Sequence, residues 1–143
     1  MRTILLVDDS PDDCFLFEEA LKAAGAKASF RTMGTGEEAI AYLSGEGKYS
    51  NRDKWPEPDI VFLDVKLPLR SGFEVLERLR GQGVGTFPVV LMMSASLDPG
   101  DVKRAYQLRA NGYLLKPGSF DELVELLRSF DSLWLRGSLF PAP

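Results

Sequence analysis

The chain has 143 residues, 45% of them hydrophobic and 27% charged, so its length and composition predict one globular domain with a core of its own. The net charge of −4 and the pI near 4.9 argue against a general affinity for nucleic acid, which needs clustered cations. Since no apolar stretch reaches the roughly 18 residues of a membrane span and the first residues do not read as a signal peptide, we expect no membrane partner and a cytoplasmic location.

Five short apolar runs alternate with amphipathic segments along the chain. Each amphipathic segment begins with Ser, Thr or Asp followed three residues later by an acid, which is typical of a helix start. The predicted strands are Thr3 to Val7, Ala28 to Thr32, Ile60 to Leu63, Val89 to Met93 and Tyr113 to Leu115, and the predicted helix caps are Ser10, Thr35, Ser71, Asp98 and Ser119. Strict alternation of strands and helices predicts a parallel sheet with helices on both faces, a doubly wound α/β sandwich.

A long polar connection, Gly45 to Pro58, interrupts this economical alternation and carries Tyr49 and Trp55. Loops of this length are often functional or mobile, but an evolutionarily neutral insertion would have the same length and composition. Both interpretations stay open.

Charged or hydroxyl side chains end four of the five predicted strands. Asp8 and Asp9 follow the first strand, Asp64 the third, Ser94 the fourth and Lys116 the fifth. Because the carboxyl ends of parallel strands meet at one edge of a sheet, we expect these side chains to share a site. Carboxylates there suit Mg²⁺, and one of them can act as a nucleophile toward phosphorus. The hydroxyl and the ammonium can donate hydrogen bonds to phosphoryl oxygens.

The absence of histidine and the single cysteine limit the kinds of reaction that this chain can perform. The chain has no histidine, which excludes Ser-His-Asp and Cys-His catalysis, histidine metal sites and a phosphohistidine carried by this chain. Cys14 is the single cysteine, so an intramolecular disulfide is impossible, and we expect it to be a small buried hydrophobe. Carboxylates, hydroxyls and lysine remain to perform the reaction.

In this order the motifs VDDSP, FLDVKLP, MSAS and YLLKP resemble those of a response-regulator receiver domain, from Arg2 to about Trp134. The resemblance implies the flavodoxin-like (βα)5 fold with strands in the order 2-1-3-4-5. It implies a module of a two-component phosphorelay that accepts a phosphoryl group on Asp64 from a histidine kinase and signals through altered protein contacts. Such a module is not an enzyme beyond its own phosphotransfer and dephosphorylation.

The resemblance also assigns roles around the acceptor. It implies Mg²⁺ held by Asp9, Asp64 and the backbone carbonyl of Lys66, with Asp8 acting through water. In other members the residues two beyond the phosphoacceptor and two beyond the switch hydroxyl, here Lys66 and Ser96, tune phosphoryl lifetime.

The family's switch has matching residues as well. The Ser94 hydroxyl and the Tyr113 ring would move on phosphorylation and change the face made by the fourth helix, fifth strand and fifth helix. A cis peptide between Lys116 and Pro117 would aim the lysine into the site.

A narrower likeness concerns the type of regulator. The segment AYLSGEGKYS, the extended loop before Asp59 and a terminal helix that ends with SLWL resemble stand-alone regulators of bacteriophytochrome-class histidine kinases. The resemblance therefore implies a kinase of that class as the partner.

The last predicted helix, about Phe120 to Leu135, has an unusually wide apolar stripe, formed by Phe120, Leu123, Leu126, Leu127, Phe130, Leu133 and Trp134. We expect a receiver domain over residues 1–136 and a tail over 137–143. The excess apolar surface predicts a homodimer with contacts from Leu126, Leu133, Trp134 and Phe140. The alternative is a tail that folds back onto its own domain.

Two other functions fit the same architecture less well. A haloacid-dehalogenase-like phosphatase also uses an aspartyl nucleophile and Mg²⁺, but it needs Asp-x-Asp after its first strand, where this chain has adjacent Asp8 and Asp9. A flavodoxin-like cofactor binder needs a phosphate-binding turn rich in Ser, Thr and Gly, whereas DDSPDD would repel phosphate.

Overall fold

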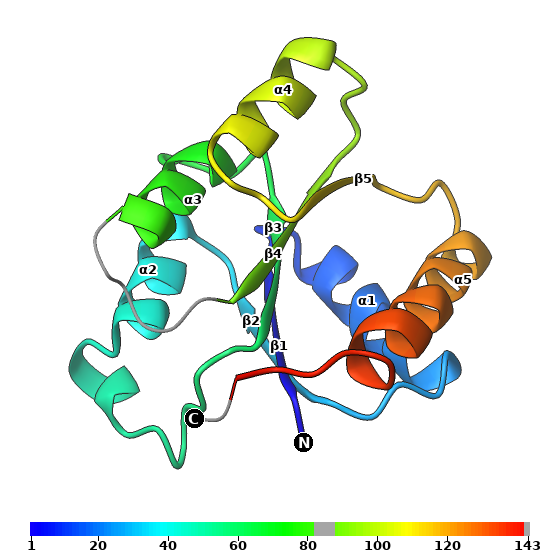
Figure 1. Ribbon diagram of the computed structural model, residues 1–143, viewed down its shortest axis with the longest axis horizontal. Helices are drawn as coiled ribbons and strands as arrows, with labels where there is room; N and C mark the ends of the chain where they lie inside the picture. Colours follow the sequence, from blue (N-terminus) through cyan, green and yellow to red (C-terminus); the bar gives the residue numbers. More distant parts are fainter. Residues whose placement is uncertain (82–87, 142–143) are drawn as a thin grey trace.

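The computed structural model describes residues 1–81 and 88–141. Five parallel strands form one sheet in the order β2-β1-β3-β4-β5, which confirms the predicted topology (Figure 1). The strands are β1 (Thr3–Val7), β2 (Ser29–Met33), β3 (Ile60–Asp64), β4 (Val89–Ser94) and β5 (Gly112–Leu115). The helices are α1 (Pro11–Ala23), α2 (Gly36–Ser44), η1 (Gly47–Ser50), α3 (Gly72–Gly81), α4 (Pro99–Gln107), α5 (Phe120–Phe130) and the π-helical turn η2 (Asp131–Leu135).

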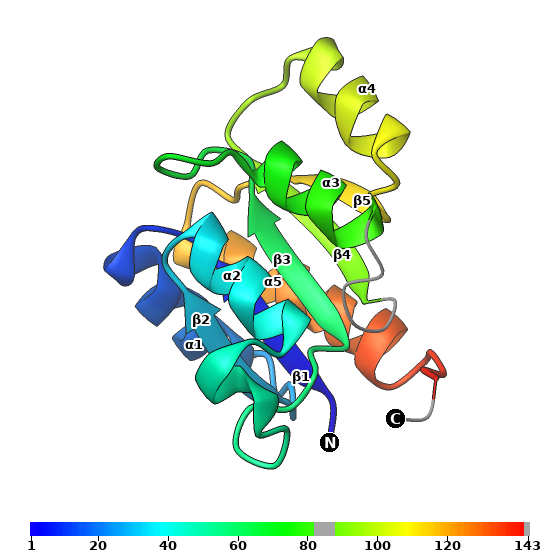
Figure 2. The same cartoon turned by 90° about the vertical axis from the view of Figure 1, so that its left-hand side faces the viewer.

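The helices form a layer on each face of the sheet. Helices α1 and α5 cover one face, while α2, α3 and α4 lie on the other (Figures 1 and 2). Side chains alternate along each strand, so the two faces have separate cores. On the α1 and α5 side, the Phe62 ring lies 5.0 Å from the rings of both Phe17 and Phe130.

The strand register aligns the ends that carry the polar side chains. Val7 pairs with Leu63, so Asp8 and Asp64 come at the same level of neighbouring strands β1 and β3. Ser94 ends β4 and pairs with Leu115, directly before Lys116. The sheet therefore delivers all four strand-end groups to one edge.

Helix caps fix where each helix begins after this edge. The side chains of Ser10, Thr35, Ser71 and Ser119 each accept a hydrogen bond from the backbone N–H three residues on, as predicted. Asp98 also caps its helix, but it accepts from Gly100 N instead of the residue at the third position.

The connection before β3 packs as part of the core on the α2 side. The Tyr49 ring is buried and lies 5.3 Å from the Tyr42 ring and 5.0 Å from the Trp55 ring. The Arg52 guanidinium donates to the carbonyl oxygens of Tyr42 and Leu43, at 2.9 and 3.3 Å. Aromatic stacking and a capped α2 carboxyl terminus hold this segment in place.

The carboxyl-terminal segment turns back toward the amino terminus after η2 (Figure 1). The Arg2 guanidinium lies 4.7 Å from the centre of the Phe140 ring. Leu126, Trp134 and Phe140 pack partly against the core on the α1 and α5 side, whereas Leu133 is 63% exposed. Three of the four residues expected at a dimer contact therefore also contact their own domain, which is what the fold-back alternative expects. Among the described residues, no helix is long and apolar enough to cross a membrane.

Candidate functional site

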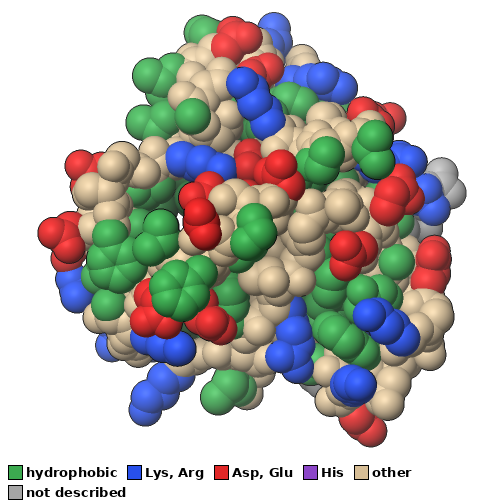
Figure 3. Space-filling view, turned by 180° about the vertical axis from the view of Figure 1, so that it is seen from behind, with side chains coloured by type: hydrophobic (Ala, Val, Ile, Leu, Met, Phe, Trp, Pro, Cys, Tyr) green, Lys and Arg blue, Asp and Glu red, His purple; other side chains and the backbone are tan. Residues whose placement is uncertain are grey.

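Three aspartates converge at the carboxyl edge of the sheet. Asp8 follows β1, Asp9 lies in the turn before α1, and Asp64 is the last residue of β3. One carboxylate oxygen of each lies within 4.8 Å of the others. Asp8 and Asp64 are buried while Asp9 is exposed, so the cluster opens to solvent on one side. Figure 3 shows the face toward which the strands run, where acidic side chains gather near the middle.

Lys116 reaches across the sheet edge into this cluster. Its Nζ lies 2.8 Å from Asp64 Oδ2 and 3.3 Å from Asp8 Oδ2, and both contacts are hydrogen-bonded ion pairs. A third carboxylate, Asp13 Oδ2 on α1, lies 3.7 Å from the same nitrogen. The structure thus brings together the strand-end acids and the lysine predicted from sequence.

Burial and neighbouring charges shift the pKa values of Asp8 and Lys116. Burial raises the pKa of Asp8, although the N–H of Ser10 and the Lys116 charge oppose that rise. For Lys116, burial acts to lower the pKa, but the hydrogen bond and charge of Asp64, together with those of Asp8, outweigh it and raise the pKa. The lysine is therefore a fixed cation between carboxylates.

The expected cis peptide between Lys116 and Pro117 is wrong for this structure. The structure has no cis peptide bond among the residues it describes, so this bond is trans. Lys116 N donates to Ser94 O at 2.8 Å, which fixes the backbone at the end of β5. From that position the long side chain reaches Asp64 with the peptide bond trans, so aiming the ammonium does not need the cis isomer.

The donor set fits a divalent cation with oxygen ligands. Three carboxylates lie together, and one lysine leaves most of their charge uncompensated, which a hard cation such as Mg²⁺ would neutralise. The N–H of Lys66 donates to Asp64 Oδ1 at 3.1 Å and orients that carboxylate. Asp8, Asp9 and Asp64 are the side chains that would hold the ion.

The predicted switch residues lie beside the cluster and are linked to one another through the loop after β4. Ser94 is 2% exposed, and its Oγ accepts a hydrogen bond from Ser96 N at 3.0 Å. The Tyr113 hydroxyl donates to Ser96 O at 3.1 Å, and Ser96 Oγ donates to Asp101 Oδ2 at 3.2 Å. Among the described residues, the Ser94 hydroxyl has its hydrogen bond with this loop and none with the three carboxylates.

Two residues of the site were not predicted from the sequence. In the sequence, Asp13 was identified only as the acid three residues after the Ser10 cap, because its contact with Lys116 depends on tertiary structure. Gly72 begins α3, and a Cβ atom there would lie 2.1 Å from the backbone oxygen of Asp64. A glycine at the first position of a helix, directly after the predicted cap Ser71, was the available signal for this close approach.

Known proteins with a similar sequence include receiver domains of response regulators. The sequence profile of the response regulator receiver domain matches residues 4–128. The response regulator Rcp1 of Synechocystis sp. is 32% identical over 142 residues, which cover 99% of this chain and 94% of that protein.

Several solved structures of response regulators superimpose on nearly the whole chain. A response regulator in red light signaling of R. palustris, RPA3017, superimposes with a TM-score of 0.92 at 29% identity, covering 100% of both chains. The phosphorylated cyanobacterial phytochrome response regulator RcpA gives 0.88 at 30% identity, covering 99% of both chains. The Mn²⁺-bound form of Rcp1 gives 0.86 at 30% identity, covering 99% of this chain and 100% of that one.

Proposed function

The chain belongs to the response regulator receiver family, and on that premise we propose that Asp64 is its phosphoacceptor. The chain is a signalling module whose acidic pocket serves phosphoacceptance, and it is not an enzyme of the phosphatase type considered from the sequence. The observation that carries the choice of Asp64 is its contact with Lys116. It is the buried carboxylate that pairs most closely with the cation able to meet a phosphoryl oxygen.

The proposed reaction transfers a phosphoryl group between two proteins. An Asp64 carboxylate oxygen attacks the phosphorus, the bond from phosphorus to a histidine nitrogen of the donor breaks, and an aspartyl-phosphate remains. This chain has no histidine, so the phosphohistidine of the donor lies outside these 143 residues. A sensor histidine kinase meets this requirement.

A divalent cation supports the transfer by neutralising charge. We assign Mg²⁺ to Asp9, Asp64 and the backbone carbonyl of Lys66, with Asp8 acting through water. The clustering of three carboxylates supports the assignment, as does the Mn²⁺-bound structure of Rcp1. The ion would offset the repulsion between these carboxylates and the incoming phosphoryl oxygens.

The phosphoryl group would act on the rest of the molecule through Ser94 and Tyr113. The Ser94 hydroxyl would exchange its bond with the loop for one with a phosphoryl oxygen. That exchange would release Ser96, which the Tyr113 hydroxyl now contacts at 3.1 Å. A change in this loop alters the face formed by α4, β5 and α5, where a downstream protein would bind.

The kinase we propose is of the phytochrome class. The support is the similarity to RcpA, described as a phytochrome response regulator, and to RPA3017, described as acting in red light signaling. We place the protein with that kinase in the cytoplasm.

We also propose a homodimer through the end of the carboxyl-terminal helix. Leu133 is 63% exposed and Leu139 is 98% exposed, although their neighbours Trp134 and Phe140 pack against their own domain. Covering these leucines with a second copy would remove apolar surface from water. The dimer contact would then include the outer sides of Leu126, Trp134 and Phe140.

The metal dependence of phosphorylation tests the proposed function. The protein is incubated with a small acyl phosphate over a range of Mg²⁺ concentrations, and adduct formation is followed by mass. The expected rate rises to a plateau with Mg²⁺ and vanishes on chelation. A rate independent of Mg²⁺ would contradict the metal assignment.

A further inference from the structure

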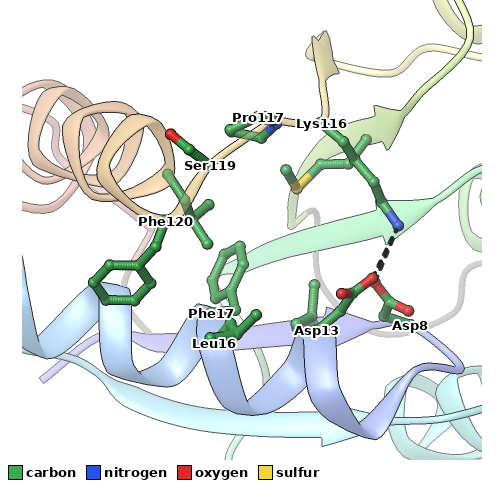
Figure 4. A pocket seen from close by; sticks show the side chains of 12 residues that line it. Asp8, Asp13, Leu16, Phe17, Lys116, Pro117, Ser119 and Phe120 are labelled. Atoms are coloured by element: carbon green, nitrogen blue, oxygen red, sulfur yellow. Dashed lines mark hydrogen bonds and ion pairs between the residues drawn. The ribbon is translucent and has the colours of Figure 1, made fainter.

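Asp13 is the carboxylate that contacts Lys116 from outside the cluster of three aspartates. It lies in the first turn of α1, where its N–H donates to Ser10 Oγ at 3.2 Å, so the helix start fixes its position. Its Oδ2 lies 3.7 Å from Lys116 Nζ. Figure 4 shows Asp13 on α1 below the lysine.

The other two partners of Lys116 are the ones that a metal ion would take. Asp8 and Asp64 hold the ammonium at 3.3 and 2.8 Å, and both belong to the proposed metal site. When a divalent cation engages Asp64 directly and Asp8 through water, the charge of both carboxylates is shared and the cation repels the ammonium. Lys116 then needs another counter-charge to stay within reach of Asp64.

Asp13 has the properties that this role requires. Its side chain is 52% exposed, so its charge is not committed to a buried cluster. It lines a cavity of about 300 Å³ together with Asp8, Lys116 and Pro117, which leaves the ammonium room to shift toward α1.

We propose that Asp13 is a positioning residue that holds the Lys116 ammonium on the α1 side of the site when Asp8 and Asp64 bind the metal ion. The lysine then remains poised to meet a phosphoryl oxygen on Asp64. This inference rests on the proposed function, because it concerns the same site, and it adds a role for a residue outside the metal and phosphoacceptor set.

The neighbouring residue supplies a matched control. Asp12 is also in the first turn of α1 and is exposed, but the described contacts of Lys116 do not include it. Asp12→Asn and Asp13→Asn therefore remove the same charge from neighbouring positions in the first turn of α1. A difference between them measures the contact with Lys116 and not the general field.

The test is calorimetric titration of the full chain with Mg²⁺ alone. Without Asp13 the ammonium depends more on Asp8 and Asp64, so it competes harder with the ion. We expect Asp13→Asn to raise the Mg²⁺ Kd about threefold more than Asp12→Asn does, in keeping with a partly exposed ion pair. Asp13→Glu, which keeps the charge, should recover most of the affinity.

A double-mutant cycle separates positioning from a structural effect. In a Lys116→Gln background the two Asn variants should have equal Mg²⁺ affinities, because the residue on which Asp13 acts is gone. Equal affinities of the two variants with Lys116 present, or a difference that persists in Lys116→Gln, would overturn the role of Asp13. If the unaltered chain binds no Mg²⁺, the proposed function fails together with this inference, whereas failure of the Asn comparison alone leaves the proposed function standing.

Discussion

The Lys116 ammonium lies 2.8 Å from Asp64 Oδ2, although β4 lies between β3, which ends at Asp64, and β5, which ends directly before Lys116. The same nitrogen contacts Asp8, so one cation offsets two buried carboxylates. Replacing Lys116 by Met would leave those carboxylates unpaired. We expect the free energy of unfolding without metal to fall by about 1–3 kcal/mol, less than for a fully buried pair because the lysine is partly exposed.

Divalent cations should reverse this loss. Mg²⁺ can replace the lysine as counter-charge and meets no competing ammonium in the variant. Urea unfolding with and without Mg²⁺ measures both effects, with Lys103→Met on the exposed face of α4 as the control. A stability deficit of the same size at all Mg²⁺ concentrations would show that Lys116 does not neutralise the metal-binding carboxylates.

Gly72 is predicted to be intolerant of any side chain. A Cβ atom there would lie 2.1 Å from the backbone oxygen of Asp64, and backbone cannot yield as a flexible side chain can. We expect Gly72→Ala to destabilise the protein by about 2–4 kcal/mol and to slow phosphorylation by shifting Asp64. Gly34→Ala is the control, since nothing lies within 4 Å of a Cβ atom at that position. Equal melting temperatures for the two variants would contradict the prediction.

Cys14 should be an unreactive thiol in the folded protein. Burial, followed by the charges of Asp8 and Asp13, raises its pKa from 9.0 to about 11. A raised acid pKa favours the neutral thiol, so below pH 9 the thiolate is about a hundredfold rarer than at the ordinary pKa. Alkylation at pH 8 should therefore be far slower in native protein than in urea. Rates within threefold of each other would contradict the shift.

The homodimer makes a prediction about one exposed leucine. Leu133→Asp places a charge in the proposed contact and should weaken association at least tenfold, because a charge there cannot be buried without a partner. Sedimentation at micromolar concentration, before and after phosphorylation, measures the association. Ser132→Asp, an exposed neighbour, controls for the added charge. A chain that stays monomeric in both states would refute the dimer.

Most of the fold could be predicted from sequence because its signals are local. Buried strands appear as apolar runs, and the caps at Ser10, Thr35, Ser71 and Ser119 mark where helices begin. The strand ends matched to within one residue. Parallel pairing then gathers Asp8, Asp64 and Lys116 at one edge without further information.

What could not be predicted depends on contacts between distant residues. The meeting of Asp13 with Lys116 joins positions far apart in the chain, and the closeness of Gly72 to the Asp64 carbonyl follows from the path of the turn before α3. Tyr49 packs against Tyr42 and Trp55, so part of the long polar connection belongs to the core. The polar composition of this segment did not indicate that packing.

Asp64 is the residue on which we propose that the phosphoryl group is carried. The most direct test is the intact mass of the protein after incubation with Mg²⁺ and a small acyl phosphate, compared with that of Asp64→Asn and of Asp12→Asn. We expect an adduct of one phosphoryl group on the unaltered chain and on Asp12→Asn, and none on Asp64→Asn. No adduct on the unaltered chain, or an adduct that survives in Asp64→Asn, would contradict it.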